Sequence, residues 1–460
     1  MPGISIIGVV VGTIVALALL PENVRPAGAL RPVAIAMIAG LVTGPLLSAS
    51  LNLRFLLRTE NVIGMAPVYW LLLDLLTGAY EMKDVTHAAV RESFITIGVF
   101  TCAYWVGTMG RPWRLHQGFF EVCSHRIKTN ALMPIVLLCF VLAMGRFAIP
   151  CKFDLILMIN SVTRARWAAP WARGALGGWD AFSDHLSYFG YLLPTLSVVL
   201  ARRKSWFHLS TLTAITCSLI FLLFLSQSGS RRIMGVCLGA ALFFWILDQQ
   251  KLKPRALIVM AACLAGILVV MQTMVVTRTL GVRDMGGMSN ASSIAMESLK
   301  GKDYGPSVPV GLHIDDNILR LAQSVMYVPE RFDYVYHGVI WQTIVRPIPR
   351  VLWPGKPMDS GFRLYEIINS GASLSTTIVG EFWISWGYMA LVLGGLFYGR
   401  LATLSSPLFL AQPDSMAPMF YGYMTMTLFV GYRSLVEVIL FSYALFGWWF
   451  AMWMINKFRR

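Results

Sequence analysis

The chain has 460 residues, of which 57% are hydrophobic and 13% are charged, and its mean hydropathy is +0.64. Soluble domains carry roughly 25% charged residues, so this composition excludes an ordinary soluble protein and indicates one that crosses a membrane several times. The formal net charge is +15, but no basic cluster accompanies a nucleic-acid-binding motif, and we expect no nucleic-acid partner.

Twelve apolar segments are expected to cross the lipid bilayer as helices, because about 20 apolar residues span its hydrocarbon core. They are residues 4–20, 31–50, 62–79, 92–110, 130–149, 186–201, 207–225, 233–248, 255–276, 378–399, 417–433 and 435–455. No basic residue precedes the first apolar run, which favours a retained helix over a signal peptide. The expected fold class is therefore an all-α polytopic membrane protein, with nine spans in residues 1–276 and three in residues 378–460.

Basic residues mark alternate connections between these spans. Lys and Arg gather near residues 54–58, 111–128, 202–204, 251–255 and 457–460. Short cytoplasmic loops carry the Lys and Arg excess of a membrane protein, which predicts that both termini are cytoplasmic. The same rule puts three segments on the outer, periplasmic face: residues 150–185, 226–232 and 277–377.

The outer segment 277–377 is expected to be solvated and folded, because it holds 19 charged side chains. Apolar residues recur at helical spacing in 291–301 and 314–326, which predicts short helices lying across the membrane surface.

Two outer stretches combine arginines with features of the membrane interface. In TRARWAAPWARGALGGWD (163–180), Arg164 and Arg166 alternate with tryptophans. Tryptophan favours the interface, so an amphipathic surface helix is one interpretation and a contact with lipid phosphate is the other. In SQSGSRRI (226–233), Arg231 and Arg232 follow a turn of small residues. They either extend to lipid headgroups or form an anion site. Basic residues that orient a membrane protein lie on its cytoplasmic side, so the predicted outer location of these two argues against a role in orientation alone.

The stretch RPIPRVLWPGKP (346–357) is expected to be a rigid cationic loop. Its prolines fix φ and remove backbone donors, which excludes a helix interior. We interpret it as presenting Arg346, Arg350 and Lys356 to an anion, and the planar guanidinium group suits phosphate in particular.

Further candidates lie near this loop and in the last spans. Glu381 sits just inside a predicted span, where an ionisable residue suggests a function. Arg433 and Glu437 are four residues apart and are expected on one helical face, where they either neutralise each other or join the site. His337 is close in sequence to Arg346. No cysteine or histidine has metal-ligand spacing, so we expect neither a metal nor a cofactor.

Three motifs resemble a known family. IPRVLWPGKP (348–357) precedes SLSTTIVGEFWISWGYMALVLGG (373–395), and SGSRR (228–232) lies far upstream. With the twelve expected spans and the large outer segment, they resemble the bacterial O-antigen and oligosaccharide repeat-unit polymerases of the Wzy type. At WISWG (383–387) the chain departs from the family, which often has an aromatic-Asn-Phe before the late glycine.

The resemblance implies a membrane glycosyltransferase of GT-C type in the bacterial inner membrane. Such an enzyme transfers a glycan from undecaprenyl diphosphate onto the next lipid-linked repeat unit, without a metal, and a chain-length regulator is a candidate protein partner. Mapped onto this sequence, the family motifs select Arg231, Arg232, Arg350, Lys356 and Glu381.

The chemistry of the residues agrees with these roles in outline. Guanidinium groups can stabilise the negative charge that develops on a diphosphate leaving group, which assigns catalytic roles to Arg231, Arg232 and Arg350. Glu381 or His337 is expected to be the general base that deprotonates the acceptor hydroxyl. Substrate binding is assigned to the remaining cations of the set, which are Arg164, Arg166, Arg346, Lys356 and Arg433.

Other functions use a similar cationic cavity. A flippase for lipid-linked sugars would more typically contain internal repeats and ionisable groups deep within spans. A glycan ligase is chemically close to a polymerase, and the sequence does not separate the two. A membrane acyltransferase and a non-enzymatic assembly partner also stay open.

Overall fold

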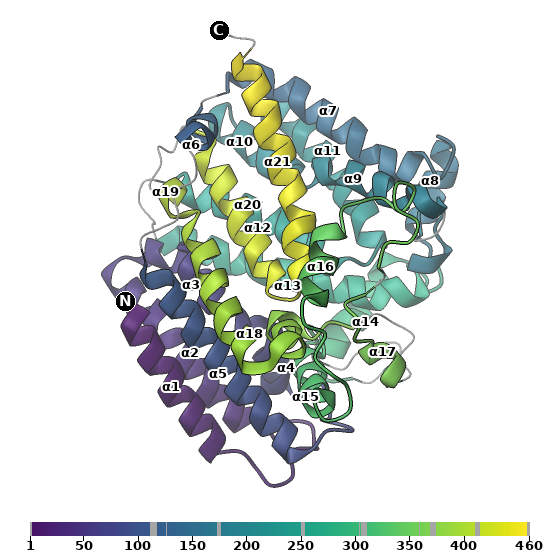
Figure 1. The fold of residues 1–460 in the computed structure, drawn as a ribbon. Helices are drawn as coiled ribbons and strands as arrows, with labels where there is room; N and C mark the ends of the chain where they lie inside the picture. Colours follow the sequence, from purple (N-terminus) through teal and green to yellow (C-terminus); the bar gives the residue numbers. More distant parts are fainter. Residues whose placement is uncertain are drawn as a thin grey trace.

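The computed structural model describes residues 2–110, 117–125, 127–172, 176–249, 254–302, 304, 311–357, 359–368, 374–409 and 415–457. All regular secondary structure within these residues is helical (Figure 1). The α-helices are α1 (Pro2–Ala18), α2 (Arg31–Leu51), α3 (Thr59–Gly64), α4 (Leu73–Thr77), α5 (His87–Met109), α6 (Gln117–Ser124), α7 (Thr129–Ala148), α8 (Leu155–Val162), α9 (Asp180–Gly190), α10 (Leu193–Arg203), α11 (Leu209–Gln227), α12 (Arg231–Leu247), α13 (Pro254–Leu280), α14 (Met288–Leu299), α15 (Asn317–Tyr327), α16 (Gly338–Val345), α17 (Leu364–Ile367), α18 (Thr377–Thr403), α19 (Ser406–Phe409), α20 (Ala417–Gly431) and α21 (Leu435–Lys457). Four short helical turns of other types are η1 (Leu53–Leu57), η2 (Val68–Leu72), η3 (Arg166–Ala168) and η4 (Gly177–Trp179).

Helices long and apolar enough to cross a membrane number six in the described part of the chain. They are Arg31–Leu51, Thr129–Ala148, Leu209–Gln227, Ile258–Arg278, Thr377–Phe409 and Leu435–Met454. Each coincides with a span predicted from the sequence, which confirms an all-helical chain with helices of membrane-spanning length.

The other six predicted spans are also helical, but they are shorter, interrupted or more polar. The helices α1, α12 and α20 have 17, 17 and 15 residues. The segment predicted at 62–79 is divided into α3, η2 and α4 around Pro67. The segment predicted at 186–201 is divided into α9 and α10 just before Pro194. The total of twelve spans therefore stays a prediction.

The connections gather at two ends of the helix bundle. At the end that we call inner, Arg54 donates to the carbonyl of Leu247 at 2.9 Å, and Arg202 pairs with Asp248 at 2.6 Å. These contacts join connections that the positive-inside rule assigned to one side. The start of α1 and the end of α21 lie away from the green segment that follows α13 (Figure 1).

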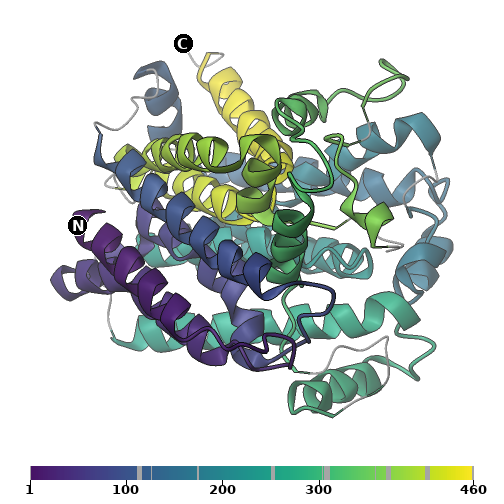
Figure 2. The ribbon, with the colours of Figure 1, turned by 60° about the horizontal axis from the view of Figure 1, so that its bottom comes forward.

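At the opposite end, which we call outer, the three predicted outer segments meet one another. Gln227 donates to the carbonyl of Ala165 at 3.2 Å, and the backbone N–H of Arg283 donates to Thr163 at 3.1 Å. The outer segment itself forms one edge of the molecule, with α14, α16 and α17 spread along it (Figure 2). These contacts join predicted inner connections to one another and predicted outer segments to one another, and the topology of the chain in the membrane stays a prediction.

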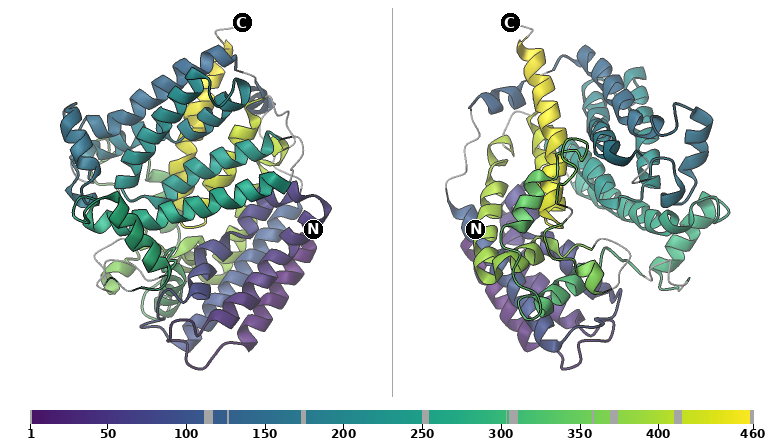
Figure 3. Two further views of the ribbon diagram at one scale, coloured as in Figure 1. Left: turned by 180° about the vertical axis from the view of Figure 1, so that it is seen from behind. Right: turned by 45° about the vertical axis from the view of Figure 1, so that its right-hand side comes forward.

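Glycines allow the helices α5 and α18 to approach each other closely. A Cβ at Gly399 would lie 2.1 Å from the carbonyl oxygen of Tyr104, and a Cβ at Gly395 would lie 2.6 Å from that of Phe100. Small residues let membrane helices approach in this way. The N-terminal helices α1, α2 and α5 run side by side, and α7 and α11–α13 lie apart from them (Figure 3).

The outer segments agree only in part with the sequence analysis. The helix predicted within 314–326 is present as α15, but it packs against α5 and α18, and its Ile318, Leu321 and Ala322 are fully buried. An amphipathic helix was one of two interpretations of the stretch 163–180, but its described residues contain only the short turns η3 and η4 and the first residue of α9.

The predicted span 378–399 is interrupted. Trp386 (φ −150°, ψ 30°) and Gly387 (φ 57°, ψ −135°) leave helical geometry within α18. The carbonyls freed at this break accept the backbone N–H groups of Val335 and Tyr336 at 2.9 and 3.1 Å. The outer segment therefore docks onto the break, and the first part of α18 belongs to the outer end.

Candidate functional site

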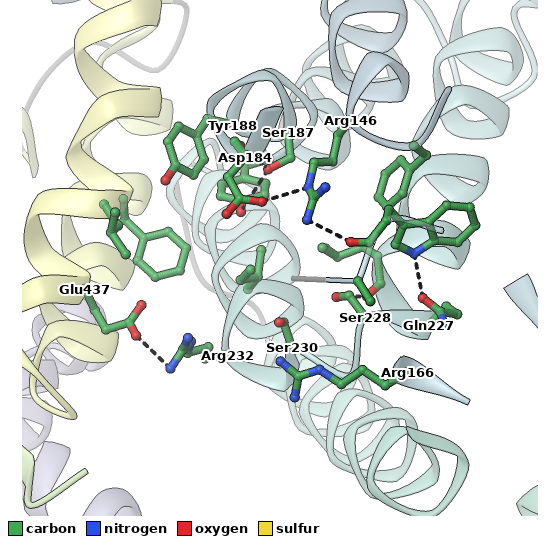
Figure 4. Close-up of a pocket in the computed structure, with 18 of the residues that line it drawn as sticks. Arg146, Arg166, Asp184, Ser187, Tyr188, Gln227, Ser228, Ser230, Arg232 and Glu437 are labelled. Atoms are coloured by element: carbon green, nitrogen blue, oxygen red, sulfur yellow. Dashed lines mark hydrogen bonds and ion pairs between the residues drawn. The ribbon is translucent and has the colours of Figure 1, made fainter. Parts of the chain in front are cut away.

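A cavity of about 140 Å³ opens at the outer end, between α21 on one side and α9, α11 and α12 on the other (Figure 4). One water needs roughly 10–15 Å³ on this measure, so the cavity has room for a small polar group. Its polar lining is Arg146, Arg166, Asp184, Ser187, Tyr188, Gln227, Ser228, Ser230, Arg232 and Glu437. Two carboxylates and three guanidinium groups thus meet in one small space.

Arg232 and Glu437 form an ion pair across the cavity. Arg232 lies in the first turn of α12 and Glu437 in the first turn of α21, and their charged groups are 2.7 Å apart. The Glu437 side chain is 7% exposed, whereas that of Arg232 is 28% exposed. The positive end of the α12 dipole adds to the attraction for an anion here.

Arg146 and Asp184 form a second pair on the opposite wall, at 2.7 Å. Arg146 also donates to the carbonyl of Trp171 at 3.1 Å, and the Trp171 indole donates to Gln227 at 2.7 Å. These linked contacts brace the wall of the cavity (Figure 4).

Arg166 reaches the cavity from the turn η3. Its guanidinium carbon lies 4.8 Å from the ring centroid of Trp167, a cation–π distance. Arg164, two residues earlier, is exposed and does not line the cavity. The structure therefore brings Arg166 and Arg232 together from the predicted set, and it leaves Arg164 outside.

Arg231 points away from the cavity and holds the outer segment instead. Its guanidinium donates to the carbonyls of His313 and Ile314 at 2.8 and 2.7 Å. On the other side of the same peptide, the carboxylate of Asp74 accepts the N–H groups of Ile314 and Asp315 at 2.7 and 2.9 Å. Arg231 is thus a positioning residue in this structure.

Arg433 forms two ion pairs. The pairing with Glu437 that the sequence offered is present with the charged groups 4.0 Å apart, although α20 ends at Gly431 and α21 begins at Leu435, so that the two residues do not share one helical face. The closer pair joins Arg433 to Asp315 at 2.9 Å. Burial alone would raise the pKa of Asp315, but the positive charges of Arg433 and Arg231 hold that pKa below its usual value.

Lys356 does not face outward from the proline-rich loop. It is 7% exposed, and its ammonium group donates to the carbonyls of Arg346 and Ile348 at 3.0 and 2.7 Å. Burial, together with the positive charges of Arg346 and Arg350, lowers the pKa of Lys356. The lysine braces the loop from within, so we do not carry it into the proposed binding site.

Arg346 and Arg350 are half-buried. The chain after α16 runs past the outer end of α21 towards α8 and α9 (Figure 1). Arg346 is close enough to Tyr188, a cavity residue, to act on it electrostatically. Both arginines act electrostatically on Lys356 of the same loop.

The two predicted base candidates lie outside the cavity. The carboxylate of Glu381 accepts the Ser434 hydroxyl at 2.5 Å and the backbone N–H of Leu435 at 2.8 Å. Glu381 thereby caps the start of α21, which is a structural role. His337 is exposed at the start of α16.

Sequence reasoning missed Arg146 and Asp184, which line the cavity, and Asp315, which pairs with Arg433. Arg146 lies near the end of a predicted span, and an ionisable residue there was a usable signal. Asp184 and Asp315 had no such signal, because each is one of several acids in an outer segment and its partner is distant in sequence.

Comparisons with known proteins add no identification: the sequence matches no family model, no curated protein and no solved structure. The site therefore has to be interpreted from its own chemistry. Guanidinium groups at the mouth and walls of a small cavity can hold the oxygens of a phosphate or diphosphate. The two cavity carboxylates can accept protons or hydrogen-bond to hydroxyl groups.

Proposed function

We propose that the chain is a bacterial membrane glycosyltransferase that polymerises undecaprenyl-diphosphate-linked oligosaccharide repeat units into O-antigen, capsule or exopolysaccharide. The observation that carries this proposal is the arginine-lined cavity at the outer end, where Arg166 and Arg232 meet and where Arg346 of the proline-rich loop acts electrostatically on the lining residue Tyr188. The motif resemblance supports the same class.

The proposed reaction needs positive charge more than it needs a covalent protein intermediate. When the anomeric bond to the carrier breaks, negative charge develops on the diphosphate leaving group. Arginines that are already fixed in place stabilise such charge without reorganisation. Arg232 and Arg166 are the cavity arginines proposed to meet the diphosphate, and Arg350 is proposed to meet it from the loop.

The proposed arrangement has twelve spans in the bacterial inner membrane, a GT-C type architecture and both termini in the cytoplasm. Six membrane-length helices support it, together with the contacts that join predicted inner connections to one another and predicted outer segments to one another. In this arrangement the lipid-linked donor and acceptor reach the cavity at the periplasmic face.

Purified protein in liposomes, supplied with lipid-linked repeat units, tests the proposal. Polymerisation should yield a ladder of glycan lengths. A strain lacking the chain should still attach single repeat units to the final acceptor, whereas loss of a ligase would leave no attached units. Transport of repeat units across the liposome membrane without a change in glycan length would instead indicate a flippase.

The proposed reaction is also expected to proceed in EDTA, since the arginines are assigned the charge stabilisation that a divalent ion would otherwise provide. The ladder should be equal with and without the chelator. A ladder that returns only after magnesium or manganese is added would contradict the arginine-based site.

A further inference from the structure

We propose that Glu437 is the general base of the transfer, and that the diphosphate releases it by drawing Arg232 into its own coordination. This inference rests on the proposed function and deepens it. It assigns the base to a residue other than Glu381 and His337, the two candidates from the sequence.

The position of Glu437 is the first reason. Its carboxylate lines the cavity and points towards Arg232 (Figure 4). The two candidates from the sequence lack this access, because Glu381 is occupied by the Ser434 hydroxyl and the Leu435 N–H and His337 does not line the cavity. A general base has to reach the proton that it removes, and Glu437 lies beside the proposed diphosphate site.

The unequal exposure of the two cavity ion pairs is the second reason. In the pair of Arg232 and Glu437, the arginine is 28% exposed and the glutamate 7%. In the pair of Arg146 and Asp184, the arginine is only 12% exposed and is also held by the Trp171 carbonyl. A ligand entering the cavity therefore reaches the guanidinium of Arg232 more readily than that of Arg146.

The third reason is the effect on Glu437 when the diphosphate replaces it as the partner of Arg232. Diphosphate oxygens form strong charge-assisted hydrogen bonds to guanidinium. Glu437 would then stay buried with its 2.7 Å partner drawn away, and a buried carboxylate that loses its partner gains by binding a proton. Of the other groups that face it, Arg433 is 4.0 Å away and already pairs with Asp315, while Tyr188 and Glu381 add no positive charge.

The proposed step moves one proton to Glu437 and one glycan to the acceptor. The acceptor sugar hydroxyl gives its proton to the Glu437 carboxylate, and the electron pair on its oxygen forms the new bond to the anomeric carbon. The bond from that carbon to the diphosphate oxygen breaks, and its electron pair leaves with the diphosphate. Arg232 meets the added negative charge, so activation of the acceptor is tied to the presence of the donor.

The test separates binding from turnover by using undecaprenyl diphosphate in detergent micelles as the binding probe and lipid-linked repeat units as the substrate. Glu437→Gln should bind the probe at least as tightly as the wild type, because the charged competitor for Arg232 is removed, while its turnover falls by about 10²–10⁴. Arg232→Gln should weaken binding by about tenfold or more. Asp248→Asn, which neutralises the acid of the inner Arg202 pair, is the matched control and should change neither quantity.

Two further outcomes keep the inference separable from the function on which it rests. Normal turnover by Glu437→Gln, or weakened probe binding by this variant, contradicts the inference alone. A wild-type protein that makes no polymer contradicts the proposed function and this inference together. If Glu437→Gln is not recovered from membranes, Glu437→Asp takes its place: it retains a carboxylate and should retain probe binding with reduced turnover, and full turnover would count against the inference.

Discussion

The three cations of the proline-rich loop have different surroundings, although the sequence presents them as equals. Lys356 donates to two carbonyls of its own loop, whereas Arg346 and Arg350 are half-buried at the edge of the outer end. Composition alone predicts a cationic loop but cannot tell a bracing lysine from a binding arginine, because the difference depends on how the prolines fold the loop back on itself.

Replacing Arg350 tests the catalytic assignment at this scale. Arg350→Ala should reduce chain extension by about 10²–10³, the usual effect of losing one preorganised charge-stabilising donor, with normal amounts of protein in the membrane. Arg350→Lys should be nearly as harmful, since a point charge does not replace a planar fork. Glycan ladders and immunoblots of membrane fractions measure both effects. A normal ladder, or a protein missing from the membrane, would make this residue structural.

Replacing Lys356 should change the stability of the loop, in contrast to replacing Arg350. Lys356→Met keeps the apolar stem but removes the ammonium group, and it should destabilise the loop locally by about 1–3 kcal/mol, because two carbonyls lose a charged donor. Hydrogen exchange across residues 346–357 measures this change, and Arg350→Ala serves as the comparison with unchanged exchange. Equal protection in the two variants would argue against the bracing role.

At the scale of elements, the break within α18 is the feature that hydropathy concealed. Residues 378–399 are apolar enough to predict one uninterrupted span, and that prediction is right about the helix but wrong about its continuity. The break depends on Gly387 and on hydrogen bonds from Val335 and Tyr336. These partners lie some fifty residues earlier in the chain, so no local pattern reveals them.

Gly387→Ala is expected to lower the free energy of unfolding by about 1–3 kcal/mol, because φ of 57° with ψ of −135° is poorly accessible to residues with a Cβ. That Cβ would also lie 2.8 Å from the Tyr334 hydroxyl. Gly447→Ala is the matched control, since its Cβ meets nothing within 4 Å. Thermal unfolding in detergent compares the two variants. Equal unfolding midpoints would show that the backbone conformation at residue 387 does not require glycine.

The candidate site could be predicted only in part for a related reason. SGSRR pointed to Arg232, which lines the cavity, because a turn of small residues marks the start of α12. The same motif did not distinguish Arg232, which faces the cavity, from Arg231, which binds His313 and Ile314. Adjacent residues on a helix point about 100° apart, and only the packing of neighbouring elements decides which of them faces the ligand.

At the scale of the whole molecule, hydropathy predicted the helical character of the chain. Each predicted span contains helix, and six of them have membrane-spanning length, because bilayer thickness constrains the chain locally. Hydropathy and charge could not predict how the outer segment docks, because its docking depends on contacts between residues far apart in sequence, such as that of Asp74 with Ile314.

The orientation of the molecule can be measured by thiol labelling. In a background with the exposed Cys263 replaced by serine, Ser289→Cys in α14 should react with a membrane-impermeant reagent in intact spheroplasts. Ser205→Cys at the inner end should react only after lysis. Both serines are exposed, so accessibility to the reagent reports sidedness. The reverse pattern would invert the predicted topology.

The contacts of residues 313–315 also determine when, during synthesis, the first part of the chain can complete its packing. Asp74 finds its two backbone partners 240 residues later in the chain, and at about 5–20 residues per second a ribosome needs roughly 10–50 s to make that length. Until then the segment of α3, η2 and α4 carries an acid without these native donors. The segment of α3, η2 and α4 therefore completes its native hydrogen bonds only after residues 313–315 have been made, which leaves an interval in which the first part of the chain is incompletely assembled.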